Sequence, residues 1–522
     1  MLIHHFLEKS AELFPDKVAV ICDDARCSYA ELNGMANNLA GWLIGRGLEN
    51  GERVALLLQN SLEYVASYYG ILKAGGVIVP LGSDLKPDGL RQLLQKLGAQ
   101  VLITSARFER LVEGAGCEAL GIHTALVAET RRSWDNAPFS VHSWEDVKSA
   151  ATRANPGIHM TDTDLASIIF TSGSMGQPKG VMLSHANIVA NTNSVCQFLQ
   201  LSSADRQMVV LPFHYVMGKS LLNTHIAVGG SVVINNRFAF PADVLQQMER
   251  EEVTGFSGVP STYAYLLHRS PLRSYRNRLG SLRYCSQAGG HLAWQVKEDV
   301  MEALPPHTRL YIMYGATEAA ARLSFVEPER LREKPDSIGR AIPGVTLWIK
   351  DDQGRELPAG QVGELIAEGA NIMRGYWQDA AATAAVLGPC GYHTGDMGYR
   401  DEDGYFYIVG RKDNQIKVGG HRLNPQEVED ALMATGLVLE VKVFGLPDPL
   451  LGNRLVALVA PITSACTPQE ILALCAARLP RHKIPSQLKL VAALPKNSSG
   501  KVDSLRCHEL IGYEVSVVAT QT

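Results

Sequence analysis

Between residues 165 and 325 the sequence alternates short β-rich runs with helical stretches, and this alternation limits the fold more than any other feature. The run "ASIIFTSG" is followed by "SHANIVANTNSVCQFL", and "QMVVLPFHY" is followed by "KSLLNTHIAVG". Short apolar runs between amphipathic helices are typical of a parallel sheet with helices on its faces. The sequence therefore predicts an α/β fold, with a large N-terminal domain of mostly parallel sheets flanked by helices.

Polar clusters follow five of the expected strands. They occupy 171–173, His214, 257–258, 287–290 and 314–318. Because ligands of open parallel sheets bind beyond the carboxyl ends of the strands, these clusters indicate one shared cleft.

The pattern changes near residue 337. The segment "VTLWIKDDQGRELPAGQVGELIAEG" places turn-rich "DDQG" and "PAG" between strands, which predicts a small antiparallel or barrel-like unit over about 337–411. Further on, Asn424, Pro425 and Glu427 have the order of cap, first-turn proline and third-position acid that begins a helix. We expect an N-terminal domain over 1–411 and a small α+β domain over 412–522.

Composition narrows the class of protein. A chain of 522 residues is too long for one ordinary core, and 46% hydrophobic with 20% charged residues is typical of a globular protein. A net charge of -4 provides no basic field, so nucleic acid and an anionic membrane surface are not expected as partners. Nine cysteines without a C-x-x-C pair argue against a zinc site and a disulfide framework.

The N-terminal segment "MLIHHFLEKSAELFPDKVAV" has no charged leader before an apolar core and no small-residue cleavage site. The sequence contains no apolar run of about 18 residues, so no membrane-spanning helix is expected. We therefore expect the protein in the cytoplasm.

The segment "TSGSMGQPKG" at 171–180 offers hydroxyls, glycine backbone and one cation, Lys179, within ten residues. Such a loop suits a polyanion, because glycines let backbone amides approach it closely. It differs from the common nucleotide loop, since Gly180 stands where a Ser or Thr would hold the metal. On these residues alone, a phosphate site and a surface turn both remain open.

Other polar motifs are equally open when taken singly. A carboxylate beside a phosphate loop needs a divalent cation between them, so Glu318 in "YGATEAA" is a candidate Mg²⁺ ligand or a solvated loop acid. Asp396 in "YHTGDMG" is a candidate acceptor for ribose hydroxyls or part of an ordinary turn. The segment "GRKDNQIKVGGHR", Lys501 in "NSSGKVD" and His214 each have a structural alternative as well.

Taken together and in order, these motifs resemble the adenylate-forming superfamily of acyl-CoA synthetases, beetle luciferases and peptide-synthetase adenylation domains, and most of all an acyl-CoA ligase-like member. The resemblance runs from "AVICDDARCSYAELNGMANNLA" to Lys501. It implies that a carboxylate attacks the α-phosphate of ATP to give an acyl-adenylate and pyrophosphate. A pantetheine thiol of CoA or of a carrier protein then takes the acyl group and releases AMP.

The resemblance also implies roles for single residues around the nucleotide. Thr317 would reach the α-phosphate and Glu318 would bind Mg²⁺. Gly289 and Gly290 would line the adenine pocket. The β- and γ-phosphates would be held by Thr171, Ser172, Gly173, Ser174 and Lys179, and the adenosine by Tyr314, Asp396 and Arg411.

Family members perform the two half-reactions by rotating the C-terminal domain, which implies that 412–522 is a mobile lid with its hinge at Asp413. Lys501 would bridge the reacting carboxylate and the nucleotide, as a lysine with an ordinary pKa of about 10.4 stays cationic. In the second orientation Lys417 would face the cleft, with Gly419 and Gly420 along the thiol tunnel.

His214 matches an aromatic position that gates the thiol. Amino-acid-activating members commonly place an Asp after it, where this chain has Tyr215, so an alkyl or aryl acid is favoured over an amino acid. The acyl pocket would contain Tyr215, Met217, Val259, Tyr263, Gly315, Ala316 and Ala319. The alternatives to an acyl-CoA synthetase are a stand-alone carrier-protein ligase and a catalytically inactive nucleotide-binding protein.

Overall fold

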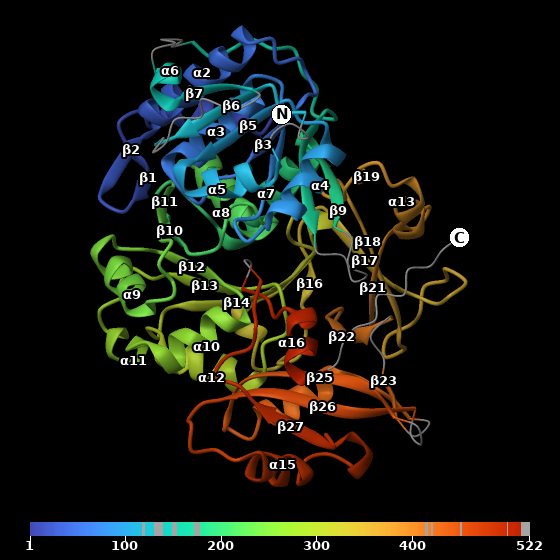
Figure 1. Ribbon diagram of the computed structural model, residues 1–522. Helices are drawn as coiled ribbons and strands as arrows, with labels where there is room; N and C mark the ends of the chain where they lie inside the picture. The colour runs from blue at the N-terminus through green and yellow to red at the C-terminus, as the bar shows by residue number, and fades with distance from the viewer. Residues whose placement is uncertain are drawn as a thin grey trace.

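Two large sheets, both mostly parallel, form the N-terminal part of the chain (Figure 1). The computed structural model describes residues 1–116, 121–129, 139–148, 154–171, 178–412, 416–418, 421–448, 452–497 and 500–512. Within these ranges, the prediction of an α/β fold with parallel sheets flanked by helices is confirmed.

The first sheet has eight strands in the order β19-β9-β8-β4-β3-β5-β6-β7. Its strands are parallel from β8 to β7, and β9 and β19 extend it with antiparallel pairs. The bounds are β3 (Arg53–Leu56), β4 (Val77–Pro80), β5 (Val101–Ser105), β6 (Thr124–Ala128), β7 (Ser140–Ser143), β8 (Leu165–Thr171), β9 (Lys179–Ser184) and β19 (Gly375–Tyr376).

The second sheet has nine strands in the order β16-β15-β14-β13-β12-β10-β11-β1-β2. It is parallel from β14 to β1, with antiparallel strands at both edges. The bounds are β1 (Val18–Cys22), β2 (Ala25–Ser28), β10 (Arg206–Val209), β11 (Ser231–Ile234), β12 (Gly255–Gly258), β13 (Tyr284–Gln287), β14 (Arg309–Tyr314), β15 (Ser324–Val326) and β16 (Arg340–Ala341).

This division corrects the prediction of one sheet over 165–325, because β8 belongs to the first sheet and β10 to the second. Most residues of both strands are buried, although β10 contains the polar Arg206 and Gln207, and periodicity carries no information about which neighbouring strand each one will pair with.

Helices cover these sheets, and several begin at sequence-coded caps. At the start of α2, the Ser28 side chain accepts from the Glu31 N–H while Glu31 accepts from the Ser28 N–H, which is a complete capping box. The helices are α1 (His4–Leu13), α2 (Tyr29–Gly45), α3 (Leu62–Lys73), α4 (Pro87–Leu97), α5 (Glu109–Gly114), α6 (Trp144–Lys148), α7 (His185–Leu199), α8 (Val216–Ala227), α9 (Pro241–Arg250), α10 (Pro260–Arg269), α11 (Leu272–Tyr275) and α12 (Trp294–Ala303).

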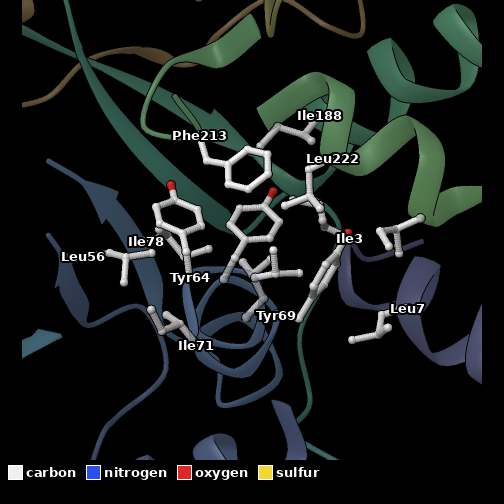
Figure 2. Packing of buried hydrophobic residues seen from close by; sticks show 14 of the residues in the cluster. Ile3, Leu7, Leu56, Tyr64, Tyr69, Ile71, Ile78, Ile188, Phe213 and Leu222 are labelled. Carbon is white, nitrogen blue, oxygen red and sulfur yellow. The ribbon is translucent and has the colours of Figure 1, made fainter. Parts of the chain in front are cut away.

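The largest core lies around α3, where every residue from Tyr64 to Lys73 is buried. Figure 2 shows Tyr64 and Tyr69 of this helix directed toward Phe213 and Leu222, which lie on the segment leading into α8 and on α8 itself. A helix that is buried on all sides serves as a packing centre between layers. The core therefore anchors α8, whose first turn contributes to the site described below.

A smaller antiparallel sheet confirms the β-rich unit. Its strands are β17 (Val345–Lys350), β18 (Gly363–Gly369), β20 (Leu387–Gly388), β21 (Gly391–Arg400) and β22 (Phe406–Arg411), with α13 (Ala380–Val386) before β20. The unit begins later than 337, because β16 pairs with β15 of the nine-stranded sheet. The segment of β19 also leaves the unit to pair with β9.

The C-terminal part has the predicted α+β composition (Figure 1). Asn424 caps α14 by accepting from the Gln426 N–H, and Pro425 is the first helical residue, so the predicted helix start is confirmed. The elements are β23 (Ile416–Val418), β24 (His421–Leu423), α14 (Pro425–Met433), β25 (Val438–Asp448), β26 (Gly452–Pro461), α15 (Pro468–Ala476), β27 (Gln487–Leu490) and α16 (Ser504–Ile511). The domain boundary at 411–412 stays a prediction.

In the part of the chain that the structure describes, no helix has the length and apolarity needed to cross a membrane.

Candidate active site

A cavity of about 130 Å³ lies where the two large sheets and the C-terminal domain meet. Three of the five predicted polar clusters contribute to its wall, those at 171–173, 287–290 and 314–318, so the shared cleft is confirmed for them. His214 and the pair 257–258 do not line it. The lining residues are Phe170, Thr171, Leu211, Pro212, Tyr215, Val216, Met217, Val259, Ala288, Gly289, Gly315, Ala316, Thr317, Ala321, Arg322, Asn497 and Lys501.

Most of the residues predicted for the acyl pocket lie on this wall, but two do not. Tyr263 is fully buried, and its hydroxyl donates to the Ser286 carbonyl oxygen at 2.8 Å. Ala319 is also fully buried, and its carbonyl oxygen accepts from the Asn371 side chain at 3.0 Å. Both residues therefore support the wall from behind and do not line the cavity.

A neighbouring cavity of about 410 Å³ collects the residues predicted for the adenosine. Gly289, Gly290, Tyr314, Asp396 and Arg411 all line it. The Tyr314 hydroxyl donates to Asp396 Oδ2, and Arg411 Nε lies 3.2 Å from Asp396 Oδ1. Register explains the ion pair, because Asp396 of β21 faces Arg411 of β22. Burial raises the pKa of Asp396, while the Tyr314 hydroxyl and Arg411 act in the opposite direction.

Lys501 belongs to the C-terminal domain and lines both cavities. Its backbone N–H donates to Asn497 Oδ1 at 3.1 Å, and the Ser261 hydroxyl of α10 donates to the Gly500 carbonyl oxygen at 2.8 Å. Gly289 has φ +86°, and a Cβ atom added there would lie 3.2 Å from Lys501 Cε. Because Gly289 has no side chain, the Lys501 side chain can occupy the space beside it.

The electrostatic surroundings of Lys501 differ from the sequence prediction. The Lys501 side chain is reached by solvent through the two cavities, but protein atoms surround most of it. This partial desolvation lowers the pKa of Lys501. Glu318 raises the pKa, whereas Arg411 and Arg322 lower it. The pKa of Lys501 is therefore lower than the ordinary lysine value that the sequence prediction assumed.

Glu318 lies in the short 3₁₀ turn Thr317–Ala319 that follows β14. Its Oε1 accepts from the Tyr376 hydroxyl at 2.8 Å, and Lys179 Nζ lies 5.0 Å from the centre of the Tyr376 ring. Among the described residues Oε2 has no hydrogen-bond partner, so one hard oxygen is available to a divalent cation, which fits Mg²⁺.

Tyr376 was not among the residues predicted from the sequence. It comes close to Glu318 and Lys179 because β19 pairs with β9, with Tyr376 opposite Val181. An isolated tyrosine in "MRGYW" carries no local sign of that pairing. Arg322, which lines the small cavity, was also missed, although a basic residue inside the apolar run "AAARLSF" is a signal that sequence reasoning had available.

His214 is buried, and its ring centre lies 4.3 Å from that of Tyr215. Burial lowers the pKa of His214 to about 4, so the imidazole is neutral at physiological pH. No hydrogen-bond partner for its Nε2 occurs in the described ranges.

Several predicted residues lie outside what the structure describes. Thr171 and Lys179 face each other at the ends of β8 and β9, and most of the loop between them is not described. The backbone of Lys417 belongs to β23, but its side chain is not described. The residues outside the described ranges are Ser172, Gly173, Ser174, Asp413, Gly419 and Gly420.

Comparison with known proteins defines the class to which this arrangement belongs. The family model of the AMP-binding enzymes matches residues 7–377, and the model of the AMP-binding enzyme C-terminal domain matches residues 427–501. The chain therefore belongs to the AMP-binding enzyme family, which confirms the resemblance to the adenylate-forming superfamily.

Similar proteins of known name span nearly the whole chain. It is 30% identical to the long-chain-fatty-acid–CoA ligase of Bacillus subtilis, over 96% of this chain and 93% of that protein. It is also 30% identical to the indoleacetate–CoA ligase of Aromatoleum aromaticum, over 100% of both.

Two solved structures are similar over nearly the whole fold. An anthranilate CoA ligase in complex with anthranoyl-AMP has a TM-score of 0.87 at 26% identity, covering 98% of this chain and 97% of that one. The o-succinylbenzoate CoA synthetase of Bacillus subtilis in complex with ATP and magnesium has a TM-score of 0.80 at 27% identity, covering 95% and 98%.

Proposed function

We propose that the protein is an ATP-dependent acyl-CoA synthetase that joins a small-molecule carboxylic acid to the thiol of CoA through an acyl-adenylate. The position of Lys501 carries this proposal, because its side chain lies between the cavity assigned to the nucleotide and the cavity assigned to the acid. Family membership supports the same reaction type, and relatives over the full length of the chain are CoA ligases. The enzyme class is an AMP-forming acid–thiol ligase.

In the first half-reaction, a carboxylate oxygen of the acid attacks the α-phosphorus of ATP, and pyrophosphate leaves. This chemistry needs alignment and charge neutralisation more than covalent help from the protein. Thr317 and Lys501 would contact the α-phosphate and the reacting carboxylate. Asp396 and Arg411 would hold the ribose, with their mutual ion pair fixing both side chains.

The pyrophosphate end would be held by Thr171, Lys179 and the loop between them. Glu318 would hold Mg²⁺ with the oxygen that Tyr376 leaves free. When bound, the ion neutralises phosphate charge. Tyr376 is thus a positioning residue, because it orients the Glu318 carboxylate.

In the second half-reaction the thiol sulfur attacks the acyl carbonyl carbon, and AMP leaves. Rotation of the C-terminal domain about Asp413 would withdraw Lys501 and bring Lys417, Gly419 and Gly420 to the cleft. His214 would act at the entry of the thiol as a neutral, space-filling ring, consistent with its lowered pKa.

A carrier protein as acceptor is the related alternative, and we propose CoA because the full-length relatives use it. An inactive nucleotide-binding protein is disfavoured, since Lys179, Glu318, Asp396 and Lys501 are all present. We propose the cytoplasm as the location.

Exchange of labelled pyrophosphate into ATP, dependent on added acid, tests the proposal. A panel of fatty, aryl and amino acids should give exchange with at least one alkyl or aryl acid, and thioester should then form with free CoA. If no acid in the panel supports exchange, the enzyme assignment is wrong. Thioester formation only with a phosphopantetheinylated protein would favour the carrier-protein alternative.

A further inference from the structure

Arg322 is a buried cation on the wall of the small cavity. It lies between the 3₁₀ turn of Glu318 and β15, and only 3% of the residue is exposed. Its Nε donates to the Met313 sulfur at 3.2 Å, and Nη1 donates to the Ala321 carbonyl oxygen at 3.4 Å. In the part of the chain that the structure describes, no carboxylate pairs with it.

The backbone of Arg322 is held firmly in place. Two buried asparagines from different elements, Asn191 of α7 and Asn371, donate to its carbonyl oxygen at 2.8 and 3.1 Å. On the other side, a Cβ atom added at Gly315 would lie 2.8 Å from the Arg322 Cα, so only glycine fits there. The side chain therefore extends from a backbone that is fixed beside the cavity, which is the support that a specific binding group requires.

Leaving a guanidinium buried without an anion is costly, because the desolvation of a charge is repaid only by a partner. Burial lowers the pKa of Arg322 to about 10, so the side chain is still cationic at neutral pH. The weak sulfur and carbonyl contacts do not neutralise that charge. The energetic balance therefore favours an anion supplied by a ligand.

The cavity itself indicates what such a ligand looks like. Among its described lining residues none is acidic, and the two cations are Lys501 and Arg322. Apart from these cations the wall is largely apolar, with residues such as Phe170, Met217 and Val259. The volume of about 130 Å³ is close to the roughly 150 Å³ of a cavity that accommodates benzene.

We propose that Arg322 binds a second carboxylate on the acid substrate, so that the preferred acid is a compact dicarboxylate with one group activated beside Lys501 and the other held by Arg322. The inference rests on the proposed function, because it assigns the activated carboxylate to Lys501. A monocarboxylic acid of the same size would leave the Arg322 charge unpaired.

The test is acid-dependent pyrophosphate exchange with two matched pairs, benzoate against isophthalate and butanoate against pentanedioate. The wild-type protein should have the higher kcat/KM for the diacid in at least one pair. In Arg322→Met, kcat/KM for that diacid should fall by about 30-fold or more, the loss expected when one partner of a buried charge pair is removed. The monoacid of the pair should lose less or gain, so that the preference reverses.

Arg322→Lys is the conservative control, because it keeps the charge and loses the bidentate geometry, so it should retain part of the diacid preference. Should Arg322→Met fail to fold, the wild-type preference and Arg322→Lys still decide the question.

Two results would overturn the inference while leaving the proposed function intact. One is a wild-type preference for the monoacid in both pairs. The other is a rise in the KM for ATP in Arg322→Met that is equal for all acids, which would place Arg322 on the α-phosphate. Absence of exchange with every acid would instead overturn the proposed function.

Discussion

Two buried regions of the molecule each contain a cation, and they compensate its charge differently. At the end of α3, the fully buried Lys73 lies 2.8 Å from Glu8 Oε1 and equally close to the side-chain oxygens of Asn33 and Asn155. On the cavity wall, the partners of the Arg322 side chain among the described residues are a sulfur and a carbonyl oxygen. The first region is complete within the chain, whereas the second is complete only with a ligand.

Lys219 of α8 is a third buried cation, which among the described residues neither pairs with a carboxylate as Lys73 does nor lies on the cavity wall as Arg322 does. It is 2% exposed, and its Nζ lies 3.4 Å from the Ser167 hydroxyl and 5.4 Å from the Tyr68 ring centre. It does not line the cavity, and within the described ranges no carboxylate pairs with it. The comparison teaches that cations facing the cavity should affect chemistry and selectivity, and cations facing the interior should affect stability.

The largest effect is expected for a cation that faces the cavity. Lys501→Ala should lower acid-dependent pyrophosphate exchange by about 10²- to 10³-fold, the usual loss when one charge-stabilising donor is removed from an active site. Thioester formation from a supplied acyl-adenylate should fall much less, and the melting temperature should hardly change. Lys417→Ala should show the opposite bias between the half-reactions. Equal losses in both half-reactions for Lys501→Ala would contradict the rotating-domain proposal.

Lys73→Met tests the interior side of the comparison. It should lower the free energy of unfolding by about 3 kcal/mol, because the partly buried Glu8 is left without its partner. Pyrophosphate exchange per folded molecule should stay at the wild-type level. Lys9→Met, an exposed position on the same helix as Glu8, is the matched control in denaturant titration. If Lys73→Met lost activity while its stability stayed unchanged, the assignment of interior cations to stability would be wrong.

Lys219→Met should change stability in a pH-dependent way. Burial lowers the pKa of Lys219 to about 7, whereas an unfolded lysine stays protonated to about pH 10.4. Between these values the unfolded state binds more protons, so wild-type stability rises with pH by at most about 1.4 kcal/mol per unit. The advantage of Lys219→Met should therefore be largest below pH 7 and shrink toward pH 10. Unfolding curves with a pH-independent difference would show that the amine is not desolvated.

The smallest effect concerns His214, whose pKa of about 4 leaves it neutral through the assay range. The ratio of kcat/KM for thioester formation in wild type and His214→Phe should be constant from pH 5.5 to 8. A bend in this ratio near pH 6.5 would mean that the ring titrates in solvent, contrary to its burial.

Local pattern predicted much of this molecule. The strands, the cap at Asn424 and the cleft follow from residue type and spacing, because those signals act within a few residues. Contacts between residues far apart in the sequence did not follow. Neither β8 nor β10 carries a local sign of the sheet that it joins, and Tyr376 is brought to Glu318 by the β19–β9 pair. The lowered pKa of Lys501 likewise depends on what surrounds it after folding.

The close approach of Gly289 to Lys501 means that a substitution at residue 289 should alter the position of the lysine side chain. One methyl group at residue 289 would compete with the lysine for the same few ångströms, and its positive φ adds strain to any replacement. A larger side chain, as in Gly289→Val, would disfavour the position that Lys501 occupies in this structure and, under the proposed rotation, would favour the second orientation of the C-terminal domain. The size of the side chain at residue 289 could therefore be varied to change how stably Lys501 occupies the cavity between the two half-reactions.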